Sequence, residues 1–132
     1  MAPQVTYTLT IEDETDVTPE ESFATEEPEL DRAECERIHQ DVARGNTWAW
    51  CMVTVTAEVT IDGETFKGRA TLGGCSYYSE ADFREPGGYF DDMCVEAFND
   101  LAASLELARK RGDVAERARL TPPERRPVPG RL

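Results

Sequence analysis

Few of the side chains that do chemistry in proteins are spaced here as a reaction centre requires. His39 is the only histidine, and acid–base or nucleophilic catalysis would need a partner nucleophile that no motif supplies. Carboxylates are abundant, but no pair is singled out as an acid–base couple. The pairs Gly73-Gly74 and Gly87-Gly88 fit neither the GxxxxGK[ST] nor the GxGxxG phosphate loop. The sequence therefore predicts no catalytic residue and no enzyme.

The four cysteines are scattered, at Cys35, Cys51, Cys75 and Cys94, with no CxxC pair. Structural zinc is coordinated by four tetrahedral ligands, which usually include close pairs in sequence. A cysteine metal site is therefore only a minor alternative. We predict no metal and no cofactor. The thiols are expected to be free, small buried groups in a reducing compartment.

The elements that must position these residues are organised around one long hairpin. From Ala49 to Ile61 the odd positions are small or apolar, while the even positions from Thr54 to Thr60 are polar. Asp62-Gly63 then predicts a two-residue type I′ turn, which sets 61 opposite 64, 59 opposite 66 and 55 opposite 70. A bulge at Gly73-Gly74 would bring Cys75 onto the face of Cys51.

Three further segments complete a β-α-β-β-α order. Gln4 to Ile11 alternates as a half-buried strand. Leu30 to Arg44 has an amphipathic helical pattern (Leu30, Cys35, Ile38, Val42) that stops at Gly45, and the segment from Asp91 to Arg111 has another (Cys94, Phe98, Leu101, Leu105, Ala108). The predicted fold class is α+β, an antiparallel sheet of three or more strands with two helices packed on one face.

We divide the chain into a single acidic domain, residues 1–112, and a Pro/Arg-rich tail, residues 113–132. Within the domain, residues 12–29 read as an acidic loop or a partly ordered arm. Residues 115–120 could extend a frayed helical turn. Beyond Thr121 the prolines exclude a regular helix or sheet, so an extended, mobile basic tail is expected.

Charge excludes several kinds of partner. The net charge is −13, and residues 109–132 hold eight Lys/Arg against three acids, so residues 1–108 carry −18. Such a field repels nucleic acid and anionic membranes and attracts basic proteins. No apolar run approaches a membrane span and no signal peptide is visible, which predicts a soluble, cytoplasmic protein.

Aromatic residues gather in the segment from Gly73 to Phe90. It holds Tyr77, Tyr78, Phe83, Tyr89 and Phe90, and Ser79 with Asp82 could cap a short helical turn. One interpretation is a lid that closes one end of the sheet, and the other is an exposed recognition loop. We expect this loop to cover Trp48 and Trp50, which the strand pattern puts on the face opposite Val53.

A motif string across residues 45–102 resembles a known group of proteins. It comprises Trp48-Ala49-Trp50-Cys51, Leu72 to Tyr77, Ser79-Glu80, Asp82-Phe83, Gly88-Tyr89-Phe90, Asp92-Met93 and Glu96-Ala97. This string is similar to that of small uncharacterised phage and mobile-element accessory proteins. The resemblance implies a phage, prophage or plasmid context and no particular activity.

The predicted function is therefore non-catalytic binding of a host protein with a basic surface, as nucleic-acid-mimicking anti-CRISPR or anti-restriction inhibitors do. From Glu12 to Glu36, twelve acids stand against Arg32 alone. The alternative is a general interaction or assembly module that uses the aromatic residues 75–90. The partner-binding residues predicted for these two surfaces are Glu12, Asp13, Glu14, Asp16, Glu20, Glu21, Glu26, Glu27, Glu29, Tyr77, Tyr78 and Phe83.

Overall fold

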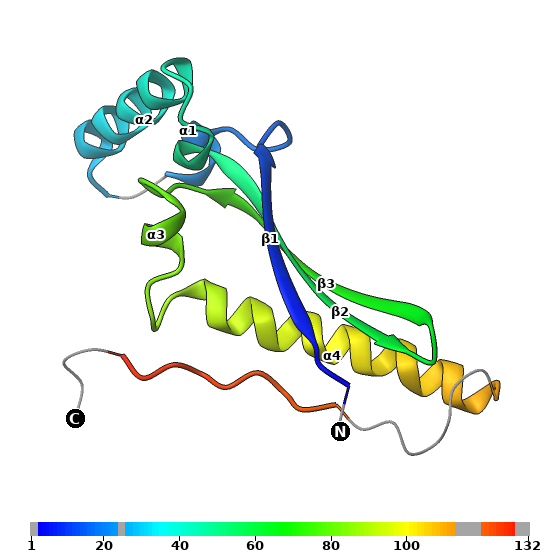
Figure 1. The fold of residues 1–132 in the computed structure, drawn as a ribbon. Helices are drawn as coiled ribbons and strands as arrows, with labels where there is room; N and C mark the ends of the chain where they lie inside the picture. The colour runs from blue at the N-terminus through cyan, green and yellow to red at the C-terminus, as the bar shows by residue number, and fades with distance from the viewer. Residues whose placement is uncertain (1–2, 24–25, 113–119, 129–132) are drawn as a thin grey trace. The chain divides into compact units, whose positions relative to one another are not determined.

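A computed structural model of the chain describes residues 3–23, 26–112 and 120–128 (Figure 1). Its elements, in chain order, are β1 (Thr6–Asp13), α1 (Pro19–Ser22), α2 (Pro28–Ala43), the 3-10 helix η1 (Thr47–Ala49), β2 (Cys51–Ile61), β3 (Glu64–Cys75), α3 (Glu80–Phe83) and α4 (Tyr89–Lys110). The strands form one antiparallel sheet in the order β1-β2-β3, which confirms the predicted α+β class.

The chain forms two compact units, and each strand contributes to both. We call one the α2 unit, residues 10–53 and 71–83, and the other the α4 unit, which takes the rest of the chain. Of the helices, α1, α2, η1 and α3 belong to the first and α4 to the second.

The hairpin has the predicted turn and register. Asp62 and Gly63 have φ values of 51° and 82°, the positive angles that a type I′ turn needs at both central positions. The hydroxyls of Thr60 and Thr65 lie 3.1 Å apart, which places 60 opposite 65 on the polar face. The odd positions of β2 from Cys51 to Ile61 are all buried. They form the centre of the core, as the alternation predicted.

Helix α4 packs against the hairpin at Gly68, where β3 has no side chain. A Cβ built there would lie 2.2 Å from the backbone nitrogen of Leu101, so only glycine lets the helix approach so closely. The backbone N–H of Arg69 donates to Asp100 at 2.9 Å beside this contact. Of the predicted stripe, Cys94, Leu101, Leu105 and Ala108 are buried, together with Met93 and Ala97.

Helix α2 is buried less than its pattern predicted. Cys35 and Ile38 are buried, but Leu30 is 63% exposed and Val42 is 37% exposed. The helix packs against α1 and η1. It ends as predicted before Gly45, whose φ of 96° stops the helix.

The interpretation of residues 12–29 as one loop or arm was wrong at both ends. Strand β1 runs on to Asp13, and α2 already begins at Pro28. Between them, α1 is a short helix whose N-cap, Thr18, accepts a hydrogen bond from the N–H of Glu21. Pro19 is buried at its start.

The tail is extended where the structure describes it, over residues 121–128. Its mobility stays a prediction. The frayed turn predicted for residues 115–120 lies outside the described residues, except for Leu120.

Trp48 and Trp50 differ from the prediction that put both on the strand. Residues 47–49 form η1, and the strand begins only at Cys51. Of the segment expected to cover them, the rings of Tyr77 and Phe83 contact that of Trp48, which is half-buried. Trp50, however, is 6% exposed because the loop before α1 covers it, and its Nε1–H donates to the carbonyl of Val17 at 2.8 Å.

All four cysteines are buried and free, as predicted. Gly74 has a φ of 63°, and the alternation of β3 breaks there, so that Cys75 is buried although Gly73 is exposed. The expected disruption at the glycines is confirmed. None of the described helices is apolar enough over a sufficient length to cross a bilayer.

Candidate functional site

The aromatic loop is held in place by a cluster of three rings within the α2 unit. The ring of Phe83 lies 5.5 Å from that of Trp48 and 4.9 Å from that of Tyr77, in an edge-to-face arrangement with the latter. The N–H of Tyr77 donates to the carbonyl of Trp48 at 2.8 Å. Phe83 is 1% exposed, so at this ring the aromatic segment acts as a lid rather than as an exposed recognition loop.

The predicted cap of α3 is present and presents Tyr78 to solvent. The N–H of Asp82 donates to Ser79 Oγ at 3.2 Å, and the N–H of Tyr78 donates to the Asp82 carboxylate at 3.0 Å. Tyr78 is 71% exposed, and the guanidinium of Arg37 lies 5.2 Å from its ring centre. Of the three predicted aromatic contact residues, Tyr78 is the accessible one, Tyr77 is half-buried and Phe83 is buried.

Glu14 supports the backbone rather than standing free. Its Oε1 accepts a hydrogen bond from the N–H of Gly74 at 2.7 Å and would be 2.6 Å from a Cβ at Gly73. This contact ties the end of β1 to the bulge in β3. Sequence reasoning counted Glu14 only as an acid, since a contact between residues sixty positions apart leaves no local pattern.

Two basic side chains of α2, Arg37 and His39, contact acids of the same unit. Arg37 pairs with Glu34 and, at 2.9 Å, with Asp41. The hydrogen bond from Arg37 lowers the pKa of Glu34 and raises that of Arg37. His39 Nε2 lies 2.6 Å from Glu20 Oε1, and this hydrogen bond lowers the pKa of the Glu20 carboxyl.

Seven carboxylates of this unit are exposed and have no ion-pair partner among residues 3–23, 26–112 and 120–128. They are Glu12, Asp13, Asp16, Glu21, Glu26, Glu29 and Glu36. The predicted contact residue Glu27 is also exposed and makes an interaction of its own. Glu12 and Asp13 end β1, Asp16, Glu21 and Glu26 lie before, within and after α1, and Glu29 and Glu36 belong to the first half and the middle of α2.

Net charge divides between the two units. The α2 unit holds fifteen acidic residues and three Lys/Arg, a net of −12, whereas the rest of the chain holds twelve and eleven, a net of −1. The acidity of the protein is therefore almost wholly a property of the α2 unit. The sequence put the acids early in the chain but could not assign residues 71–83 to the same unit.

The α2 unit also has a groove of about 220 Å³, lined by Trp50, by residues from the segment 13–19 and by residues of α2. Val17, Ile38 and Val42 are apolar members of this lining, and His39 and Asp13 are polar ones. Within the described ranges no three His, Cys, Asp or Glu side chains are grouped to hold a metal ion.

The chain was compared with protein-family models, with curated proteins and with solved structures, and none of the three comparisons gives a match. The resemblance to phage and mobile-element proteins stays a prediction.

Proposed function

We propose that the α2 unit is a non-catalytic binding module that occupies a basic, nucleic-acid-binding surface of a host protein. In a phage-type setting this is the role of an anti-CRISPR or anti-restriction inhibitor. The observation that supports it is the concentration of the net charge, −12 in this unit against −1 in the rest of the chain. Acidity that served only solubility would need no such concentration.

The pairing inside the unit strengthens this proposal. Arg37 is paired with Glu34 and Asp41, which are not among the seven exposed carboxylates, so its charge is offset locally. Long-range steering depends on the summed field, and clustered charge of one sign attracts a basic partner at a high rate. Duplex DNA carries one charge per ~1.7 Å of its axis, which is the pattern that such a partner already recognises.

The test is displacement of labelled duplex DNA from purified CRISPR and restriction effectors, followed by fluorescence anisotropy. The test variant replaces Glu12, Asp13, Asp16, Glu21 and Glu29 by their amides. The control variant makes the same change at Glu58, Asp62, Glu64, Glu85 and Glu96 in the α4 unit, so that both lose five charges. We expect the first to bind an inhibited effector at least about tenfold more weakly and the second to stay within about twofold.

Rising salt should weaken the wild-type complex, because the contacts are ionic. Affinity that is unchanged between low and high salt would contradict the proposal, as would equal losses in the two variants.

A second candidate function, an interaction module that uses the aromatic loop, is favoured by the exposure of Tyr78. Tyr78→Ala removes an exposed ring without disturbing the buried Phe83. If this change abolishes binding while the five amide substitutions leave it intact, the aromatic module is the better description.

A further inference from the structure

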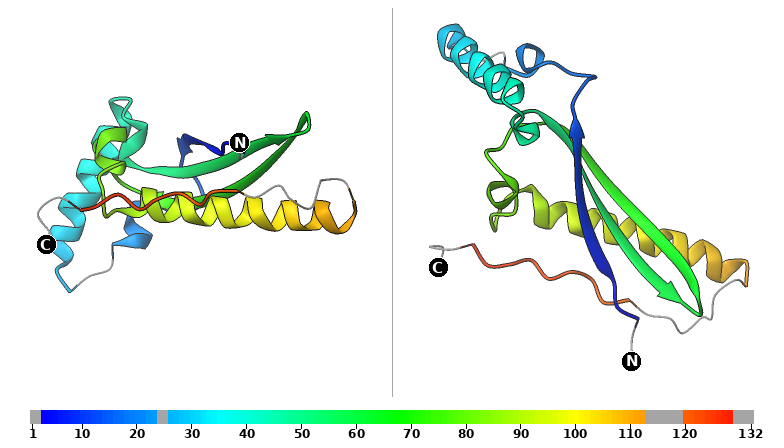
Figure 2. Two further views of the ribbon diagram at one scale, coloured as in Figure 1. Left: turned by 60° about the horizontal axis from the view of Figure 1, so that its bottom comes forward. Right: turned by 45° about the horizontal axis from the view of Figure 1, so that its top comes forward.

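Residues 120–128, which we call the strap, lie along α4 in the α4 unit. The strap is extended and carries no helix or strand (Figures 1 and 2). Nine extended residues reach up to ~30 Å, which is enough to follow fifteen residues of helix at ~1.5 Å each. Its first residue, Leu120, lines a groove together with residues of α4, and its last, Val128, lies beside Gly87 just before the helix.

The basic end of the strap sits on the first turn of α4. Arg126 Nε lies 3.0 Å from a carboxylate oxygen of Asp91, and Arg125 pairs with Asp92. The Asp91 side chain is only 12% exposed. The guanidinium of Arg126 also donates to the carbonyl of Arg84, so this arginine makes both an ionic and a backbone contact.

The ring of Phe90 completes this arginine site. Two guanidinium groups lie near it, that of Arg84 at 4.6 Å and that of Arg126 at 5.5 Å from the ring centre. One residue past Pro127, Val128 packs on Gly87, where a Cβ would be 2.7 Å from a Val128 methyl group. The carboxylates of Asp91 and Asp92, the ring face of Phe90 and the close approach at Gly87 therefore all favour an extended Arg-Arg segment at this site.

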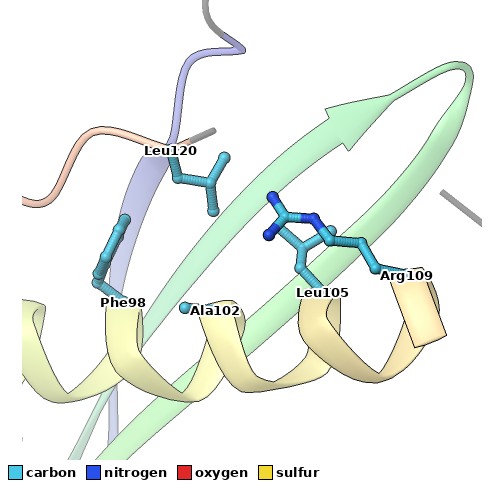
Figure 3. Close-up of a pocket in the computed structure, with 5 residues that line it drawn as sticks. All are labelled: Phe98, Ala102, Leu105, Arg109 and Leu120. Atoms are coloured by element: carbon cyan, nitrogen blue, oxygen red, sulfur yellow. The ribbon is translucent and has the colours of Figure 1, made fainter. Parts of the chain in front are cut away.

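The apolar end of the strap is an imperfect fit. Leu120 points toward a groove lined by Phe98, Ala102, Leu105 and Arg109 of α4 (Figure 3). About 310 Å³ of the groove stays open beside it. The Nε–H of Arg109 is buried without a hydrogen-bond acceptor among the described residues. A buried donor without a partner costs free energy, so this end has both unfilled apolar space and an unsatisfied donor.

We propose that this face of α4 is a binding groove for an extended basic segment of a partner protein, and that the strap is its intramolecular occupant. The partner segment has an Arg-Arg pair for Asp91 and Asp92. Five residues before that pair, the partner segment has an apolar side chain larger than leucine. A carbonyl or a carboxylate elsewhere in the segment accepts a hydrogen bond from the Nε–H of Arg109. Proline between the two anchors keeps the segment extended at low entropic cost.

Such a partner has to displace the strap, and the contacts of the strap permit this. Exposed ion pairs contribute little to stability, and the side chain of Arg125 is 64% exposed. Attachment to α4 gives the strap a local concentration on the order of 1 mM, which lowers the apparent affinity of a competing peptide. Releasing the strap should therefore make the groove more available.

The test uses a fluorescent peptide with the sequence of residues 120–128 and the change Leu120→Phe. It is titrated into the full-length protein and into the full-length Arg125→Ala/Arg126→Ala variant. We expect the variant to bind the peptide about tenfold more tightly than the wild type, because the internal competitor is gone. The unmodified peptide, with leucine, should bind more weakly than the phenylalanine peptide.

Added to that variant, Asp91→Asn/Asp92→Asn should abolish peptide binding, while the control Glu58→Gln/Glu96→Gln should leave it unchanged. Phe90→Leu in the same background keeps an apolar side chain and should lower affinity about two- to fivefold. Equal binding to the wild type and the opened variant would overturn the proposal. So would binding that ignores both Asp91/Asp92 and Phe90, and circular dichroism checks that each variant is folded.

Discussion

At the scale of single residues, burial changes the pKa of the core cysteines. Desolvation, with a smaller contribution from Cys75 and nearby acids, raises the pKa of the Cys51 thiol to about 12. Burial, followed by the charge of Glu14, raises the pKa of Cys75 to about 11. The spacing of the cysteines correctly predicted buried, free thiols. The sequence also pointed to a bulge at Gly73-Gly74 as the feature that would bring Cys75 onto the face of Cys51, and the positive φ of Gly74 and the influence of Cys75 on the Cys51 thiol agree with it.

These shifts make stability depend on pH above 9. In the unfolded chain a thiol loses its proton near its ordinary pKa of about 9, whereas the folded chain keeps the proton until about 11 to 12. The folded state then binds more protons, so the free energy of unfolding falls as pH rises through this window. We expect Cys51→Ala/Cys75→Ala to flatten the slope by up to about 1.4 kcal/mol per pH unit for each thiol.

Urea unfolding at pH 8 to 11 measures that slope. Val53→Ala serves as the control, because it removes buried apolar volume without removing a thiol. It should lower stability at every pH and leave the slope as in the wild type. A slope that is equally steep in the double cysteine variant would show that other groups produce it.

At the scale of elements, local patterns predicted the hairpin, both long helices and the turn at Asp62-Gly63. Each of these has a strict period and a clear terminator. The short helix α1 was missed although Thr18 and Pro19 are good starting residues, because four residues give no period. Trp48 was placed on a strand because the apolar alternation runs on through η1.

The contact between α4 and β3 gives a sharp prediction at this scale. Gly68→Ala would put a methyl group within 2.7 Å of three backbone atoms of α4, and a backbone cannot rotate away as a side chain does. We expect a loss of about 1–3 kcal/mol in the free energy of unfolding, as for an overpacked core. Gly73→Ala is the comparison: its methyl group meets only side-chain atoms of Glu14, which can move at the cost of the hydrogen bond from Gly74, so the loss should be smaller than at Gly68. A Gly68→Ala protein as stable as the wild type would mean that helix and strand pack less closely than described.

At the scale of the whole molecule, the segregation of charge is what the sequence predicted least well. An acidic stretch and a basic tail are visible in the sequence. Two tertiary facts are not visible there. Residues 71–83 join the acidic unit, and Arg125 and Arg126 pair with acids more than thirty positions away. Both depend on tertiary contacts without local periodicity. The chain thus has one unit with a net charge of −12 and one whose acidic and basic residues nearly balance.

The two units should respond to salt in opposite directions. In the α2 unit, a net charge of −12 destabilises the folded state through self-repulsion, and salt screens this repulsion. In the α4 unit, salt weakens the attraction of Arg125 and Arg126 for α4.

Hydrogen exchange measured by mass spectrometry at 50 and 500 mM NaCl reports on both units in one sample. We expect slower exchange over residues 28–43 and faster exchange over residues 84–92 at the higher salt. The five amide substitutions at Glu12, Asp13, Asp16, Glu21 and Glu29 should reduce the first change and leave the second unaltered, whereas a uniform shift in both segments would argue against separate electrostatic units.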